Sequence, residues 1–202
     1  MNERAAGLLE RIKALEGELQ EELETELAQG RKRLLYHIER NRIRFEQEVL
    51  DHHRRLKVGL VRFFATAHPL NIATAPVVYS LAIPFLALDL WISIYQAVCF
   101  PMYGIEHVRR SDYFIIDRHH LRYLNAVEKL NCFYCSYTNG LIAYVREIAG
   151  RTEQYWCPIK HARRVKAPHG HYDRFVPYGD AQAYRDELER LRAELAKREK
   201  AR

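Results

Sequence analysis

The stretch PLNIATAPVVYSLAIPFLALDLWISIYQAVCFPMYGI, residues 69–105, carries a single charged side chain, that of Asp89. Apolar runs of about 18 residues or more are typical of membrane segments. Asp89 separates uncharged runs of 17 residues (72–88) and 16 residues (90–105). One straight helix over the whole stretch would be about 55 Å long, against a hydrocarbon core of about 30 Å. The sequence therefore predicts a helical hairpin that turns near Pro84 and Asp89 and dips into a bilayer.

Basic residues flank this stretch on both sides. Four precede it and three follow it: Arg54, Arg55, Lys57 and Arg62, then Arg109, Arg110 and Arg118. Cytoplasmic flanks favour Lys and Arg, and a hairpin places both of its ends on one side of a membrane. We therefore expect a monotopic protein on the cytoplasmic face of the cytoplasmic membrane. The alternative is a soluble protein with very apolar core helices, which the prolines within the stretch favour because proline weakens an uninterrupted helix.

The N-terminal residues 2–66 contain no proline and are rich in helix-forming residues, which predicts one long helix with a break near Gly30. Apolar residues recur along its first half at steps of three and four: Leu8, Ile12, Leu15, Leu19, Leu23 and Leu27. A stripe this narrow is typical of coiled coils. It predicts self-association or a helical protein partner, and the alternative is a lone solvated helix. The first 30 residues carry a net charge of −5, and residues 31–62 carry +6.

Three of the four cysteines form a pattern with one histidine. Cys132 and Cys135 are three residues apart, and Cys157 and His161 follow with a spacing of four. Two close pairs of thiolate and imidazole ligands are typical of structural zinc sites. The N-terminal residues lack the apolar core of a secretory signal, so we expect cytosolic thiols rather than disulfides. Cys99 lies in the apolar stretch and is expected to be a core or lipid-facing residue.

Zinc is the expected ion at this Cys₃His site, and iron is the alternative because thiolate-rich sites also suit iron. A redox dithiol at Cys132 and Cys135, or core thiols without a ligand, are the other interpretations that the spacing leaves open. Further ligand-type or acid–base residues lie nearby, with no assigned role: Asp117, His119, His120, His169 and His171. We expect these histidines to be solvated or hydrogen-bonded rather than metal ligands.

Between the apolar stretch and the C-terminus, hydrophobic periodicity predicts two helices and a loop. Apolar residues every three positions predict a helix from Asp117 to Leu130, and a second helix follows the turn signal Asn139-Gly140. Residues 151–179 have no clean period and are expected to form loop structure. Asp180 can cap a final helix through Lys200, whose apolar stripe could pair antiparallel with the N-terminal helix.

These features predict a mostly α-helical fold in four parts. The parts are a long amphipathic helix (1–66), an apolar hairpin (67–106), a small metal-stabilised helical and loop domain (107–179) and an amphipathic C-terminal helix (180–202).

The predicted function is that of a membrane-anchored metal-binding scaffold or accessory protein, with membrane lipid and a second copy or a helical protein as partners. The alternative is a membrane-bound redox protein or metalloenzyme that acts on a lipid or quinone through thiolate-ligated iron. The familiar enzyme motifs, such as a phosphate-binding glycine loop, are absent from the sequence, so we favour a protein that is not an enzyme. Beside so apolar a stretch, the basic segments favour anionic lipid over nucleic acid.

Overall fold

The computed structural model describes residues 3–33, 36–39 and 42–197 of the chain. It is mostly helical, as the sequence predicts. The described residues form two compact units. The first unit consists of the residues up to Phe63 together with Asp117–Val127, and the second consists of Phe64–Ile116 and the residues from Glu128 onward.

The first unit begins with the long helix α1, Glu3–Arg33, and continues with a β-hairpin. Strands β1 (Tyr36–Glu39) and β2 (Arg42–Phe45) pair antiparallel, with Tyr36 opposite Phe45 and Ile38 opposite Ile43. The prediction of one helix as far as residue 66 is therefore wrong beyond α1; its positions 34–35 and 40–41 lie outside the described residues. Alternation of aromatic or β-branched residues with charged ones favours strands here. The short helices α2 (Gln47–Arg55) and α3 (Leu60–Thr66) follow.

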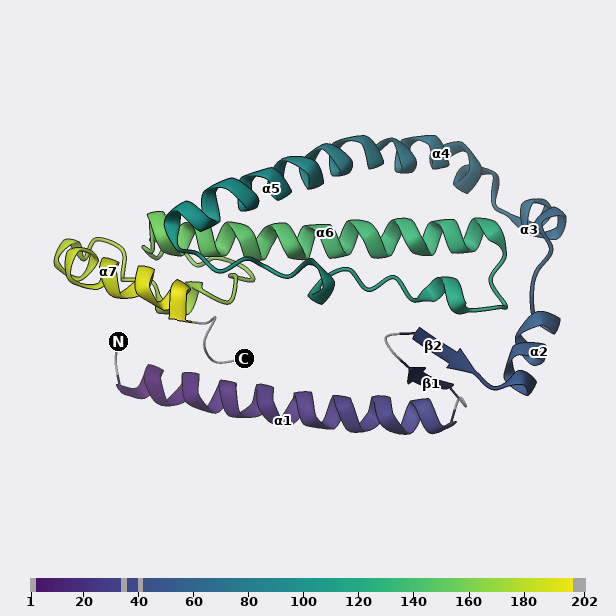
Figure 1. Ribbon diagram of the computed structural model, residues 1–202, viewed down its shortest axis with the longest axis horizontal. Coiled ribbons are helices and arrows are strands. Elements are labelled where there is room, and N and C mark those ends of the chain that lie inside the picture. Colours follow the sequence, from purple (N-terminus) through teal and green to yellow (C-terminus); the bar gives the residue numbers. More distant parts are fainter. Residues whose placement is uncertain (1–2, 34–35, 40–41, 198–202) are drawn as a thin grey trace. The chain divides into compact units, whose positions relative to one another are not determined.

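The second unit contains the apolar stretch, which forms a nearly continuous helix rather than a hairpin. Helix α4 (Pro69–Ser80) is followed by α5 (Ala82–Tyr103), and Leu81 between them keeps helical φ and ψ angles of −63° and −16°. Figure 1 shows α4 and α5 as one gently curved helix. The predicted turn at Pro84 is wrong because Pro84 lies in the first turn of α5, where its missing N–H has no helical partner to lose.

An extended return segment, residues 104–125, connects α5 to the long helix α6, Ala126–Trp156. Gly104 ends α5 in the left-handed conformation, with φ of 66°, and the Ile105 N–H donates to the Phe100 carbonyl. This arrangement is typical of helix C-termini. Within the second unit, residues 104–116 of this segment run back along α6, so the helices α4–α5 and α6 lie side by side and point the same way (Figure 1).

Helix α6 passes without interruption through Asn139-Gly140, where the sequence predicted a break between two helices. The reason is tertiary packing. The return segment lies so close to α6 that a Cβ added at Gly140 would stand 2.7 Å from the Tyr113 carbonyl oxygen. Glycine is therefore required at this position for close approach of two backbones, not for a turn.

Replacing Gly140 by alanine is expected to lower the free energy of unfolding by about 1–2 kcal/mol, because the added methyl group meets backbone rather than a flexible side chain. Chemical denaturation followed by circular dichroism measures this. Gly7→Ala is the control, since nothing lies within 4 Å of a Cβ there. That variant should be neutral or slightly stabilising, because alanine has the higher helix propensity. Equal effects of the two substitutions would contradict the close approach.

The core of the second unit lies between α5, α6 and the C-terminal helix α7, Ala181–Lys197. Phe100, Leu141, Ile148, Leu191 and Leu195 are essentially inaccessible to solvent. The α7 stripe thus packs within this unit, in place of the predicted pairing with the N-terminal helix. The predicted cap is confirmed, because the Asp180 carboxylate accepts a hydrogen bond of 2.9 Å from the Ala183 N–H. The predicted end of this helix at Lys200 lies outside the described residues.

Candidate membrane-binding face

The structure separates the two predicted pairs of metal ligands along α6. Cys132 and Cys135 lie near the beginning of the helix, and Cys157 follows its last residue, with His161 in the loop beyond. The helical rise from Cys135 to Cys157 amounts to roughly 30 Å, so the two pairs cannot share one ion. Within residues 3–33, 36–39 and 42–197, no three His, Cys, Asp or Glu side chains form a group that could hold a metal. The predicted metal-binding function, with its redox alternative, is therefore wrong.

The four cysteines are free thiols in this structure. Cys135 and Cys157 are exposed, and Cys99 and Cys132 are half-buried. His161 lies at the surface, where its backbone N–H donates to the Tyr172 hydroxyl, 2.7 Å away, and its ring stacks on Tyr172. Each of these residues thus has a local role or a solvated position. The spacing that predicted a metal site came from residues at opposite ends of one helix.

A long apolar face covers the outer side of α4–α5. The helical stretch Pro69–Tyr103 is long and apolar enough to cross a membrane, and none of its most apolar window is buried. Trp91 is 73% exposed and Met102 is 75% exposed. We call this surface the outer face and define it by its side chains that are more than half exposed: Leu70, Val77, Ile83, Leu86, Leu90, Trp91, Val98 and Met102.

The opposite side of α5 packs against α6 and the return segment. The buried amide of Gln96 accepts a hydrogen bond from the Val108 N–H and donates one to the Tyr144 hydroxyl, both at 2.9 Å. The Tyr79 hydroxyl bonds to the Asn131 side chain, and the Tyr134 hydroxyl donates to a carbonyl of α4. Large aromatic side chains fill the space between the helices. One side of α4–α5 is therefore fixed by protein, which leaves the outer face free to contact another medium.

The lone charge of the apolar stretch, Asp89, is neutralised within the protein. Arg110 of the return segment binds both carboxylate oxygens, at 2.5 and 2.6 Å, and the Tyr137 hydroxyl donates to one of them at 2.7 Å. The Asp89 side chain is only 13% exposed. The Arg110 guanidinium also stacks on the Phe114 ring, 4.0 Å from its centroid. Such bidentate pairs are among the strong hydrogen bonds of proteins, so the outer face carries no uncompensated charge from Asp89.

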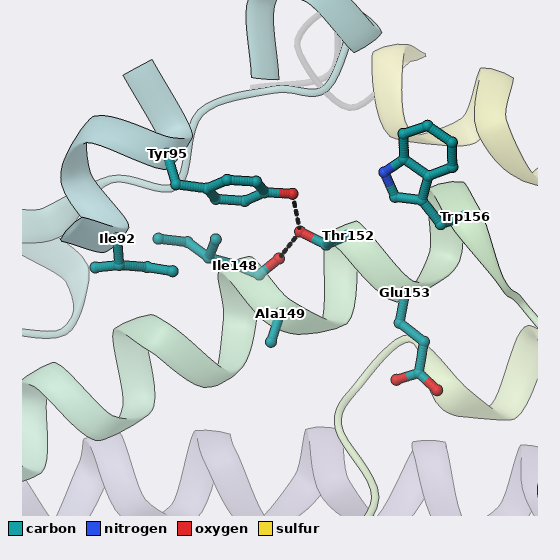
Figure 2. A pocket seen from close by; sticks show the side chains of 7 residues that line it. All are labelled: Ile92, Tyr95, Ile148, Ala149, Thr152, Glu153 and Trp156. Atoms are coloured by element: carbon teal, nitrogen blue, oxygen red, sulfur yellow. Dashed lines mark hydrogen bonds between the residues drawn. The ribbon is translucent and has the colours of Figure 1, made fainter. Parts of the chain in front are cut away.

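A pocket of about 400 Å³ opens between α5 and α6. Figure 2 shows its lining residues: Ile92, Tyr95, Ile148, Ala149, Thr152, Glu153 and Trp156. Thr152 donates to the Ile148 carbonyl, so the Tyr95 hydroxyl donates to Thr152 in turn, at 3.0 Å. The Glu153 carboxylate bonds to His169, 2.9 Å away. Because these polar groups bond to one another or to the adjoining loop, the pocket presents a mainly apolar lining next to the outer face.

Behind the pocket, His171 is buried in a polar network that the sequence did not predict. Its Nδ1 lies 2.8 Å from Gln154 Oε1, and its Nε2 lies 3.1 Å from Glu147 Oε1. Arg151 donates to the same Glu147 oxygen at 2.9 Å and to the Glu106 carbonyl at 2.6 Å. Burial opposes ionisation of Glu147, but the hydrogen bonds from His171 and Arg151 outweigh it and lower the pKa of this carboxyl to about 2. The network links α6 to the loop between α6 and α7.

The remaining polar residues that the sequence singled out fall into two places. Asp117, His119 and His120 belong to the first unit, where the rings of His119 and His120 lie with centroids 3.9 Å apart. His169 belongs to the second unit and lies against Gly150, where an added Cβ would stand 2.9 Å from its Nδ1. Neither place forms a group suited to hold a metal among the described residues.

Comparison with known proteins gives no relative: no family model, no curated protein and no solved structure matches the chain.

Proposed function

We propose that this protein attaches to lipid bilayers through the outer face of α4–α5. The observation that carries the proposal is an exposed apolar surface along a helical stretch of 35 residues, with none of its most apolar window buried. Contiguous exposed apolar surface of this kind marks interaction sites. The acyl region of a membrane suits a long aliphatic surface of this kind, which also carries aromatic residues.

The neutralisation of Asp89 supports the proposal. An unpaired carboxylate in a membrane-embedded helix costs about 2.5–3.5 kcal/mol on insertion scales. Arg110 and Tyr137 satisfy the Asp89 carboxylate from the protein side, while Leu86, Leu90 and Trp91 cover the outer side of the same helix. The structure of this segment thus keeps its one charge away from the surface that would contact lipid.

The arrangement of α6 favours attachment from one side over a full crossing. The helix runs parallel to α4–α5 and carries four charged residues in its second half: Arg146, Glu147, Arg151 and Glu153. Placing these charges across the bilayer interior is unfavourable. A pair of helices lying along the membrane surface inserts the outer face while α6 remains near the headgroups, as interfacial helices do. With basic residues on both flanks, we propose the anionic cytoplasmic face as the site of attachment.

Flotation of the full chain with lipid vesicles tests this proposal. The protein is expected to float with vesicles of neutral lipid and to float more completely when anionic lipid is included, because basic residues near the surface add electrostatic attraction. Trp91→Asp is expected to weaken binding about tenfold, since it places a charge in the inserted face. Tyr178→Asp is the matched control, because Tyr178 is an exposed aromatic residue, at 69%, outside the apolar stretch.

Retention of native circular dichroism in both variants shows that folding is not the cause of any difference. If wild-type protein fails to float, or if the two variants lose binding equally, the outer face is not the membrane contact.

A further inference from the structure

We propose that α1 pairs antiparallel with α1 of a second copy of this chain. The proposal rests on a surface separate from the outer face of α4–α5. All six members of the apolar stripe on α1, from Leu8 to Leu27, are more than half exposed. A helix of 31 residues that leaves its whole apolar stripe in solvent gains little from packing, so this stripe needs a partner.

The stripe has the symmetry that an antiparallel pair requires. The stripe consists of three pairs of residues, and the two members of each pair lie at equal distances from Gly17 to within one residue. The pairs are Leu8 and Leu27, Ile12 and Leu23, and Leu15 and Leu19. When two copies run in opposite directions and cross at Gly17, each member of the stripe therefore meets another member at the same level. The stripe extends over about 28 Å at 1.5 Å per residue, long enough for several layers of contact.

Charge selects the antiparallel direction over the parallel one. The sequence carries six Glu and no basic residue over 16–26, and a net charge of +1 over 3–13. A parallel pair in register would place the six Glu of one copy beside the same six of the other. The antiparallel pair instead brings half of this acidic segment beside the N-terminal part of the second copy, which removes much of the repulsion between like charges.

One specific ionic contact follows from this register. Arg11 lies level with position 24 of the second copy, on the flank of the stripe that also carries Glu22 and Glu26. Those two residues are one helical turn apart and share a face, and all three side chains are exposed. Arg11 of each copy therefore lies between Glu22 and Glu26 of the other, and twofold symmetry produces the contact twice.

Sedimentation velocity of the full chain in a mild detergent tests the proposal, because it gives the dimer dissociation constant for each variant. Wild-type protein is expected to dimerise, and Leu15→Asp combined with Leu19→Asp to be monomeric. Arg11→Glu is expected to weaken the dimer by about five- to tenfold, as is the pair Glu22→Lys and Glu26→Lys, because each places like charges in contact at two symmetric sites. Combining all three reversals should restore the dissociation constant to within about threefold of the wild-type value.

Controls separate this proposal from its alternatives. Glu10→Lys with Glu21→Lys makes the same charge change on the other side of α1 and should leave the dimer unchanged. Trp91→Asp should also leave it unchanged, which distinguishes pairing through α1 from association through the outer face. A parallel pair in register keeps like charges level with like charges in every variant, so the charge reversals would not weaken it. A wild-type monomer at all concentrations would mean that the stripe serves a different protein, and either result overturns the proposal.

Discussion

Replacing Arg110 by methionine is expected to lower the free energy of unfolding by about 3 kcal/mol, the largest effect of any single substitution considered for this protein. The variant leaves the Asp89 carboxylate largely buried, with only the neutral side chains of Tyr137 and Ser93 to satisfy it. An uncompensated buried charge costs far more than the ion pair contributed, because its desolvation is no longer offset. Thermal or chemical denaturation in detergent, followed by circular dichroism, measures the loss.

Two further variants identify the cause of that loss. Asp89→Leu combined with Arg110→Met removes both charges and should recover most of the stability, since replacing an entire buried ion pair by apolar residues is often nearly neutral. Arg109→Met changes the exposed neighbouring arginine and should have an effect within about 0.5 kcal/mol. If Arg110→Met and Arg109→Met destabilise the protein equally, the bidentate contact to Asp89 is not important for stability.

Local sequence signals predicted the elements whose ends are determined locally. The Asp180 cap and the stripe of the C-terminal helix are examples, because a side chain that accepts from a backbone N–H three residues ahead needs no tertiary contact. The apolar stretch at 69–105 was also evident from composition alone. The pairing of Asp89 with Arg110 could not be predicted, because Arg110 follows it by 21 residues on a segment without periodicity.

Tertiary packing explains the failures. Asn139-Gly140 is typical of a turn, yet the helix continues because its glycine admits the backbone of the return segment. Because α6 is unbroken, a helix separates Cys135 from Cys157. The wrong prediction of a turn at Gly140 therefore made it plausible that the two pairs of ligands meet at one metal ion, which they do not. Pro84 led to the same kind of error, a turn predicted where the structure has a helix, since a proline in the first turn of a helix is compatible with helix formation.

The second prediction concerns acid. Stability is expected to fall as the pH drops from about 4.5 toward 2, because the pKa of Glu147 lies near 2 in the folded protein and near its ordinary value of 4.5 in the unfolded chain. A carboxyl with a lowered folded-state pKa contributes stability above its unfolded pKa, and protonation removes that contribution as the pH falls toward the folded pKa. The unfolding free energy measured by urea titration at a series of pH values gives the slope.

The geometry of the network explains why the carboxylate form is preferred. Gln154 donates through Nε2 to the Leu191 carbonyl, so its Oε1 accepts from His171 Nδ1–H. The ring's Nε2 lies 3.1 Å from Glu147 Oε1, the oxygen that also accepts a hydrogen bond from Arg151 Nε. Both nitrogens of His171 thus lie beside acceptor oxygens, so the buried ring joins Gln154 and Glu147 in one network.

Glu147→Gln is therefore expected to cost about 2 kcal/mol at pH 7, where the carboxylate accepts charge-assisted hydrogen bonds, and to flatten the dependence of stability on pH below 4.5. The difference between wild type and variant should shrink as the wild-type carboxyl protonates. Glu189→Gln, at an exposed position on α7 with 80% of its side chain accessible, is the control and should leave both the stability and the slope unchanged. An equal acid slope in wild type and Glu147→Gln would mean that other carboxyls control the acid response and that the His171 network does not depend on the charge of Glu147.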